Sequence, residues 1–306
     1  MKNYIFASAI LLSTTLFAKT ERSFTEHKIA VGTNDIYARE YAGADPALIL
    51  LHGFPDNHSL YDSLVNKLEN RHVIVFDFIG WGLSDKPNPK NYPYSDVQQE
   101  VEIDAVVKFF NLNAVVLAPS DMSGSAAINW ALDHKSKSAG LILFNTYFQK
   151  SKYRHLPFTG QLLTIPGVRQ FTLPFCVPNF LFNPVIKLSI GGFFASKQTR
   201  KAFIPQFMGQ FKKLSGKRAF FRTVGTTNKI AKRNLARVPE LKAYAKPVSI
   251  IFGEKDKSFT KGLGEEFHTM IATSELHIIQ GAVHYPQIDK SKEVADIIVS
   301  FMNKTK

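Results

Sequence analysis

Short apolar runs that alternate with amphipathic stretches predict an α/β protein. Runs rich in Val, Ile and Leu are expected to form buried strands at residues 47–51, 73–76, 115–118, 140–145, 248–252 and 276–279. Apolar residues three and four positions apart predict helices at 59–68, 95–110, 124–134 and 292–302. Because strands of parallel sheets read as continuous apolar runs and alternate with helices, the pattern predicts a mostly parallel central sheet flanked by helices.

The strand at residues 115–118 leads into its helix through a turn of small residues. The turn reads Pro119-Ser120-Asp121-Met122-Ser123-Gly124 and has Asp121 at its apex. A sharp strand-to-helix turn strains its central residue and presents that side chain, as a nucleophile requires. Asp121 is therefore the candidate nucleophile, although an aspartate before a helix also fits a simple cap.

Further motifs follow the other predicted strands. The run at 47–51 ends in His52-Gly53-Phe54-Pro55, and the run at 73–76 ends in DFIGWGLSDKP, residues 77–87. The run at 248–252 leads to Gly253-Glu254-Lys255-Asp256, and the run at 276–279 leads to Gly281-Ala282-Val283-His284-Tyr285-Pro286. Taken alone, Asp256 fits a turn-forming aspartate and His284 a loop histidine. Their order and spacing along the chain favour a shared site.

Together these motifs resemble the α/β-hydrolase superfamily, in particular the haloalkane dehalogenase and epoxide hydrolase branch, over roughly residues 25 to 303. The GWGLSDKP and HYPQ segments are also similar to the mesoderm-specific transcript proteins. The resemblance implies an α/β-hydrolase fold with an inserted helical cap. It implies Asp121, Asp256 and His284 as the catalytic triad and the backbone N–H groups of Phe54 and Met122 as the oxyanion hole. His52 is expected to be structural.

The resemblance also implies a covalent mechanism on an apolar small molecule. Asp121 would form an alkyl ester, and water activated by His284 would hydrolyse it. Tyr147 and Tyr153 are the candidate proton donors to a leaving group, which favours an epoxide over an alkyl halide. Dehalogenases hold halide with a tryptophan where this chain has Met122, and fluoroacetate-type enzymes place arginines beside the nucleophile, where none is expected here.

The amino terminus, residues 1–18, is expected to be a signal peptide, because a basic start precedes a short apolar run that ends in a small residue. This predicts a periplasmic or secreted protein, with an uncleaved membrane anchor as the alternative. Residues 24–145 and 247–303 are predicted to form the hydrolase core. The single cysteine, Cys176, excludes an internal disulfide. No metal and no organic cofactor is predicted, because neither clustered ligands nor a phosphate-binding glycine loop is present.

Residues 146–246, the predicted cap, differ from the rest of the chain in charge and aromatic content. They hold 19 of the 38 Lys and Arg residues, one of the 25 acidic residues and 13 of the 26 Phe residues. The phenylalanines are expected either to line an apolar substrate cavity or to form ordinary cap core. The basic residues either contact an anionic membrane surface or form a solvated face, and the candidates are Lys212, Lys213, Lys217, Arg218, Lys232 and Arg233. Nucleic acid is not predicted as a partner, because no recognisable motif for it occurs.

Two alternative functions stay open on the sequence alone. A serine esterase or lipase would use Ser120 or Ser123, and a fluorophosphonate would label it. A non-catalytic lipid- or membrane-binding protein would account for the altered turn, in which Pro119 and Ser123 stand where glycines are usual. Such a protein would bind vesicles.

Overall fold

The computed structural model describes residues 21–156, 161, 165, 167 and 178–305. The predicted signal peptide at 1–18 and Cys176 lie outside the described residues. Within them, no helix is both long enough and apolar enough to cross a membrane.

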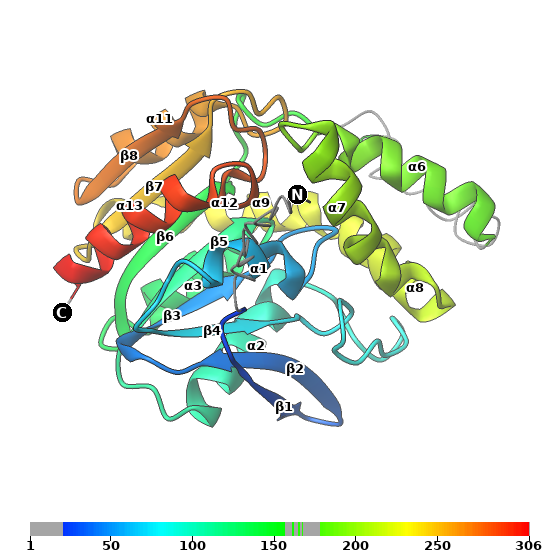
Figure 1. Cartoon of the computed structure of the whole chain (residues 1–306), viewed down its shortest axis with the longest axis horizontal. Helices are drawn as coiled ribbons and strands as arrows, with labels where there is room; N and C mark the ends of the chain where they lie inside the picture. Colours follow the sequence, from blue (N-terminus) through cyan, green and yellow to red (C-terminus); the bar gives the residue numbers. More distant parts are fainter. Residues whose placement is uncertain (1–20, 157–160, 162–164, 166, 168–177, 306) are drawn as a thin grey trace, which may run out of the picture.

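An eight-stranded, mostly parallel sheet forms the centre of the molecule (Figure 1). Its order is β1-β2-β4-β3-β5-β6-β7-β8, with β1 and β2 antiparallel to their neighbours and all other pairs parallel. The strands are β1 (Thr25–Val31), β2 (Asn34–Tyr41), β3 (Ala44–Leu51), β4 (Arg71–Phe76), β5 (Val115–Asp121), β6 (Ser138–Thr146), β7 (Val248–Gly253) and β8 (Ser274–Ile279). The predicted α/β fold is confirmed. The β1–β2 hairpin is an addition that the apolar pattern does not predict.

Helices connect the strands and pack beside the sheet (Figure 1). They are η1 (His58–Tyr61), α1 (Asp62–Val65), α2 (Asp96–Phe109), α3 (Ser123–Asp133), α11 (Lys261–Met270), α12 (Pro286–Asp289) and α13 (Ser291–Lys304). The single helix predicted at 59–68 is wrong. Asn57 caps a short 3₁₀ turn by accepting the Ser59 N–H at 3.0 Å, and the following α-helix ends at Val65.

Between β6 and β7 the chain forms a group of helices. They are α6 (Asn179–Gly191), α7 (Lys197–Met208), η2 (Gly209–Phe211), α8 (Leu214–Val224), α9 (Thr227–Leu235) and α10 (Val238–Lys242). In Figure 1, α6, α7 and α8 stand together to the right of the sheet. Phe182, Phe211 and Phe220 pack against one another there, with ring centroids 5.2–5.7 Å apart. These phenylalanines form a core of the inserted segment. Its division from the rest as a cap domain stays a prediction.

Two of the basic residues proposed to face a membrane have other partners. Lys217 is only 3 % exposed, and its Nζ lies 5.3 Å from the centre of the Phe182 ring. Arg233 forms ion pairs with Asp96 and Glu100 of α2, at 3.0 and 2.6 Å. Lys217 is therefore too buried to contact a membrane surface, and the pairing of Arg233 with α2 gives it a structural role. Contact of the remaining basic residues with a membrane stays a prediction.

Candidate active site

The turn between β5 and α3 presents the side chain of Asp121. Asp121 has φ of 53°, in the left-handed region that non-glycine residues seldom adopt. Gly124 is required in the first turn of α3, because a Cβ there would lie 1.9 Å from Oγ1 of Thr146. The same hydroxyl donates a hydrogen bond to the carbonyl of Asp121. The end of β6 thus holds the turn in its strained form.

The carboxylate of Asp121 is buried and receives a backbone hydrogen bond. The backbone N–H of Phe54 donates to Oδ2 of Asp121 at 3.0 Å, and only 6 % of Asp121 is exposed. Gly53 permits this approach, because a Cβ there would lie 2.5 Å from the Cβ of Asp121. Among the described residues, the second expected donor, Met122, makes no such bond to the carboxylate. Burial raises the pKa of Asp121 to about 6, although the positive charge of His284 and the Phe54 N–H oppose the rise.

Asp256 and His284 form a tightly bonded pair. The Nδ1 atom of His284 lies 2.7 Å from Oδ2 of Asp256, and both side chains are buried. Burial alone would lower the pKa of His284, but the charge and hydrogen bond of Asp256 raise it to about 9. Burial would likewise raise the pKa of Asp256, and the imidazole outweighs burial and lowers it. The Nε2 atom of His284 has no partner in the part of the chain that the structure describes. The charge of Asp121 is one cause of the raised pKa, so conversion of that carboxylate to a neutral ester would lower the pKa and favour the neutral imidazole.

Asn145 supports this pair, and the sequence analysis does not identify it. It ends the apolar run of β6, with φ of 28°, and its Nδ2 donates to Oδ2 of Asp256 at 2.7 Å. Its Oδ1 accepts the N–H of Gly253 at 3.0 Å. The signal that could have revealed it is a polar residue at the end of a strand adjacent to β7.

Aromatic side chains surround the imidazole. The rings of Phe193, Phe259 and Tyr285 have centroids 4.4, 5.2 and 4.9 Å from that of His284. The N–H of His284 also donates to the carbonyl of Phe193, at 3.2 Å. The inserted segment therefore contributes both an apolar surface and a direct contact to the loop that carries the histidine.

The structure separates the two candidate proton donors. Tyr147 is fully buried, and its hydroxyl has no partner among the described residues. Burial raises its pKa, the charge of Arg154 opposes the rise, and the charge of Asp121 adds to it. Tyr153 instead packs its ring over Gly262 at the start of α11, under the ammonium group of Lys152.

An arginine packs against Tyr147. The Cζ atom of Arg154 is 3.7 Å from the centre of the Tyr147 ring, and its charge is one of those that lower the pKa of Asp121. Arg154 is brought there by an isolated antiparallel bridge to Phe259, which lies far away along the chain. Nothing local in the sequence encodes that pairing, so the sequence does not predict the position of Arg154.

The two serines of the turn have structural contacts. Ser123 Oγ donates to the carbonyls of Leu51 and Ser120, at 3.1 and 2.8 Å. Ser120 Oγ accepts a hydrogen bond from Gln287 at 3.3 Å. Both residues are fully buried, and in the described residues neither hydroxyl bonds to His284.

His52 and Asp77 brace the loops behind the site. His52 Nε2 accepts the N–H of Phe78 at 3.0 Å, so the ring is neutral and structural. Asp77 accepts hydrogen bonds from the backbone and ring of His58, at 2.7 and 2.8 Å, and from the N–H of Leu83 at 2.7 Å. The DFIGWGLSDKP motif therefore supports the loop that carries Phe54.

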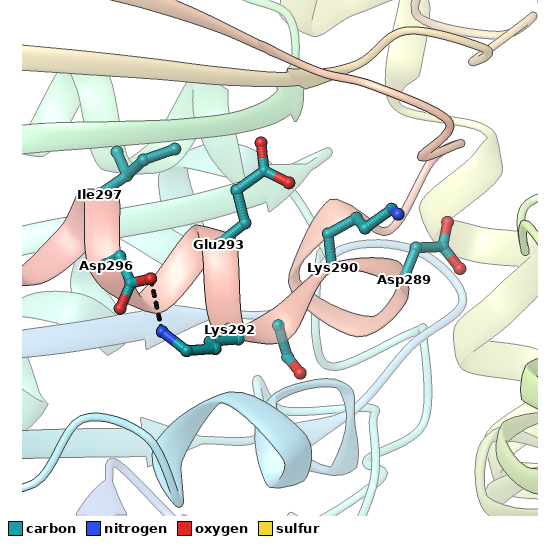
Figure 2. A pocket seen from close by; sticks show the side chains of 7 residues that line it. Asp289, Lys290, Lys292, Glu293, Asp296 and Ile297 are labelled. Atoms are coloured by element: carbon teal, nitrogen blue, oxygen red, sulfur yellow. Dashed lines mark hydrogen bonds and ion pairs between the residues drawn. The ribbon is translucent and has the colours of Figure 1, made fainter.

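One surface hollow, of about 640 Å³, lies at the start of α13 (Figure 2). Its lining is mostly charged and includes the ion pair of Lys292 and Asp296 at 2.8 Å. None of its lining residues is a predicted site residue. No group of three or more potential metal ligands occurs among the described residues.

Comparison with known proteins identifies the family of the chain and supports its fold. The model of the alpha/beta hydrolase fold family matches residues 46–291. A cis-3-alkyl-4-alkyloxetan-2-one decarboxylase from Shewanella oneidensis is 26 % identical, over 92 % of this chain and 89 % of the relative. Haloalkane dehalogenase DatA from Agrobacterium tumefaciens has a similar structure, with a TM-score of 0.79, 16 % identity and coverage of 92 % and 97 %. Epoxide hydrolase CorEH is also similar in structure, with a TM-score of 0.75 and 17 % identity, over 93 % of this chain and 100 % of the other.

Proposed function

The chain is a hydrolase of the alpha/beta hydrolase fold family, and from this premise we propose that Asp121 is its nucleophile. One arrangement carries the proposal. A buried carboxylate on a strained turn receives the Phe54 N–H, and the charge of His284 opposes the rise that burial causes in its pKa. The Nδ1 atom of that imidazole is bonded to Asp256, and its Nε2 has no partner among the described residues. These are the groups that covalent hydrolysis through an alkyl ester requires.

In the first step, an oxygen of Asp121 attacks an electrophilic carbon of an apolar substrate. The new ester bond forms as a carbon–oxygen bond of a strained ring breaks, and the ring oxygen takes the electron pair. An epoxide oxygen becomes an alcohol when it receives a proton, for which the buried phenol of Tyr147 is the candidate donor.

In the second step, Nε2 of His284 takes a proton from water, and the hydroxide attacks the ester carbonyl carbon. The Phe54 N–H donates to the oxyanion that forms. Collapse of this intermediate releases the alcohol and restores the Asp121 carboxylate, and the proton held by His284 returns to the Tyr147 phenolate. Asp256 holds the imidazole and stabilises its cation.

The relative from Shewanella oneidensis supplies a second candidate substrate. Its name describes a decarboxylase of cis-3-alkyl-4-alkyloxetan-2-ones, and the match spans most of both chains. Such a compound is a strained four-membered lactone. Attack of a carboxylate at its saturated carbon C4 would break the ring carbon–oxygen bond and leave a carboxylate.

The test is the intact mass of a His284→Gln variant after exposure to epoxides, alkyl halides, long-chain esters and alkyl oxetan-2-ones. The substitution removes the base but leaves the nucleophile, so the ester should accumulate. An adduct mapped to Asp121 and missing from the Asp121→Ala, His284→Gln double variant is expected. Turnover of a substrate by the wild type without an adduct in His284→Gln would contradict the proposal. Labelling of Ser120 or Ser123 by a fluorophosphonate would support the esterase instead.

A further inference from the structure

Arg154 lies in the aromatic surroundings of the proposed site. Its guanidinium stacks over the Tyr147 ring at 3.7 Å and lies 5.8 Å from the centre of the Phe259 ring. Phe259 in turn contacts the ring of His284. The positive charge therefore lies among the groups that surround the reacting centre.

This arginine has no acidic partner in the described residues. Its Nε is buried without a hydrogen bond, and so is the hydroxyl of Tyr147 below it. Other arginines show the usual arrangement, because Arg233 and Arg237 are paired with carboxylates at 2.6 Å. Burying a polar atom without a partner costs free energy, and these two atoms are buried although Arg154 as a whole is partly exposed. An anionic ligand would supply the missing partner.

We propose that Arg154 and the Tyr147 hydroxyl form a subsite for a carboxylate attached to an alkyl chain. This inference rests on the proposed function and specifies its substrate class. The guanidinium carries donors in a fixed fork that matches a carboxylate, and the phenol donates one more hydrogen bond. The aromatic rings nearby suit the alkyl chain.

The chemistry of the leaving group explains why such a subsite matters. An epoxide leaves as a basic alkoxide that needs a proton, which a guanidinium does not give up. An oxetan-2-one opened at C4 leaves as a carboxylate, which carries its charge without a proton and pairs with Arg154. The subsite therefore favours alkyl oxetan-2-ones over epoxides. A substrate that already bears a carboxylate would occupy the same position.

The binding test compares decanoate with 1-decanol, which share a chain and differ in head-group charge. Calorimetry on the full chain is expected to show decanoate affinity at least about tenfold weaker in Arg154→Gln, as for a lost charge-assisted hydrogen bond, and decanol affinity unchanged. Arg154→Lys should retain part of the difference. Arg218→Gln is the matched control, because Arg218 is an exposed arginine of the same inserted segment. Thermal unfolding verifies that each variant is folded.

Decanoate affinity equal in the wild type and a folded Arg154→Gln variant would overturn the subsite. At a pH well above the pKa of Asp121, slower adduct formation from an oxetan-2-one, with epoxide adducts unchanged, would assign the subsite to the leaving carboxylate. Weaker decanoate binding without that kinetic change would assign it to a carboxylate of the substrate itself. If no compound alkylates Asp121 while decanoate binding depends on Arg154, the subsite stands and the proposed nucleophile falls.

Helix α6 provides a second, independent observation. A surface helix normally turns polar residues outward. Helix α6 buries Phe182, Ile186 and Ile190, yet it also exposes Phe180 by 74 % and Leu188 by 79 %. The helix is therefore apolar on both its inner and its outer side.

Basic side chains adjoin this outer side. Lys197, Arg200 and Lys201 are exposed at the start of α7, and the side chain of Arg200 packs beside Gly191 at the end of α6. No acidic residue occurs from 147 to 239. We infer that this surface, the α6 face (Phe180, Leu188, Lys197, Arg200 and Lys201), binds an anionic lipid bilayer, with apolar side chains inserted and basic ones at the head groups.

Co-sedimentation with vesicles tests the α6 face. The wild type should pellet with phosphatidylcholine vesicles that contain phosphatidylglycerol, and less with phosphatidylcholine alone. The double variant Phe180→Ser, Leu188→Ser should pellet equally with both kinds of vesicle. The same result is expected when Lys197, Arg200 and Lys201 are replaced by glutamine. Leu235→Ser is the control, because Leu235 is an exposed apolar residue of α9, outside the α6 face. Equal pelleting of wild type and variants would overturn the inference. So would a dimer in light scattering that the serine variants dissociate.

Discussion

The two sides of the proposed site differ in how completely their polar atoms are bonded. Both carboxylate oxygens of Asp256 are satisfied, by His284, Asn145 and the N–H of Ser258. On the neighbouring side, where Arg154 bridges to Phe259 shortly after Asp256 in the chain, the hydroxyl of Tyr147 and Nε of Arg154 are buried without partners in the described residues. Because an unpartnered buried atom costs free energy, the first side is built to keep its geometry in the free protein. The second side awaits atoms from a ligand.

Asp256→Asn breaks the bonded side and should have the largest effect. The amide cannot stabilise the imidazolium, so kcat is expected to fall by about 10⁴-fold, as in other histidine–aspartate pairs. The first alkylation of Asp121 should persist, since it does not need the base. Steady-state turnover and intact mass measured on the same sample separate the two steps. A fall of less than tenfold would remove Asp256 from the mechanism.

Asp77→Asn extends the comparison to a fully bonded carboxylate outside the site. Removal of one partner from its buried pair with His58 is expected to lower the free energy of unfolding by about 3 kcal/mol or more. Burial would raise the pKa of Asp77, but His58 and the Leu83 N–H lower it to about 2. This contribution is present above the ordinary carboxyl pKa and is lost as pH falls towards 2. Urea unfolding over a pH series measures it, and equal curves for both proteins would contradict the expectation.

Tyr147→Phe removes an unpartnered hydroxyl and should leave stability within about 0.5 kcal/mol of the wild type. Epoxide turnover should fall by about 10²-fold if the phenol is the proton donor. Tyr153→Phe is the control, because that ring packs against α11. Undiminished epoxide turnover in the double variant would remove both phenols from the reaction.

The pH dependence of the first turnover probes the carboxylate between the two sides. Asp121 attacks only when ionised, and burial raises its pKa to about 6. The rate of ester formation should therefore be level above that pH and fall about tenfold per pH unit below it. Arg154→Gln removes a charge that lowers the pKa of Asp121, so the pH at which the rate begins to fall should be higher in this variant. If the rate falls at the same pH in the wild type and the variant, the guanidinium does not affect the pKa of Asp121.

The parts of the molecule that the sequence predicts well are those that one stretch of chain determines. Strands β3 to β8 carry their own apolar runs, and the turn at Asp121 is encoded by its small neighbours. The β1–β2 hairpin is half exposed and has no such run. Arg154 could not be predicted, because its position depends on a bridge to Phe259 across the fold. Met122 stands at the position of the second oxyanion-hole donor in the motif, yet among the described residues its N–H makes no hydrogen bond to the Asp121 carboxylate. A position in a motif therefore does not by itself determine a hydrogen bond.

The contact between the histidine loop and the inserted segment limits how the protein can be re-engineered. The His284 N–H is bonded to the Phe193 carbonyl, and Asp289 accepts the N–H groups of both Ala195 and Val283 at 3.0 Å. The inserted helices are therefore not an exchangeable module. A chimera that takes them from a relative would need to transplant residues 193–195 together with a matching loop at 283–289, or its imidazole would lose its orientation.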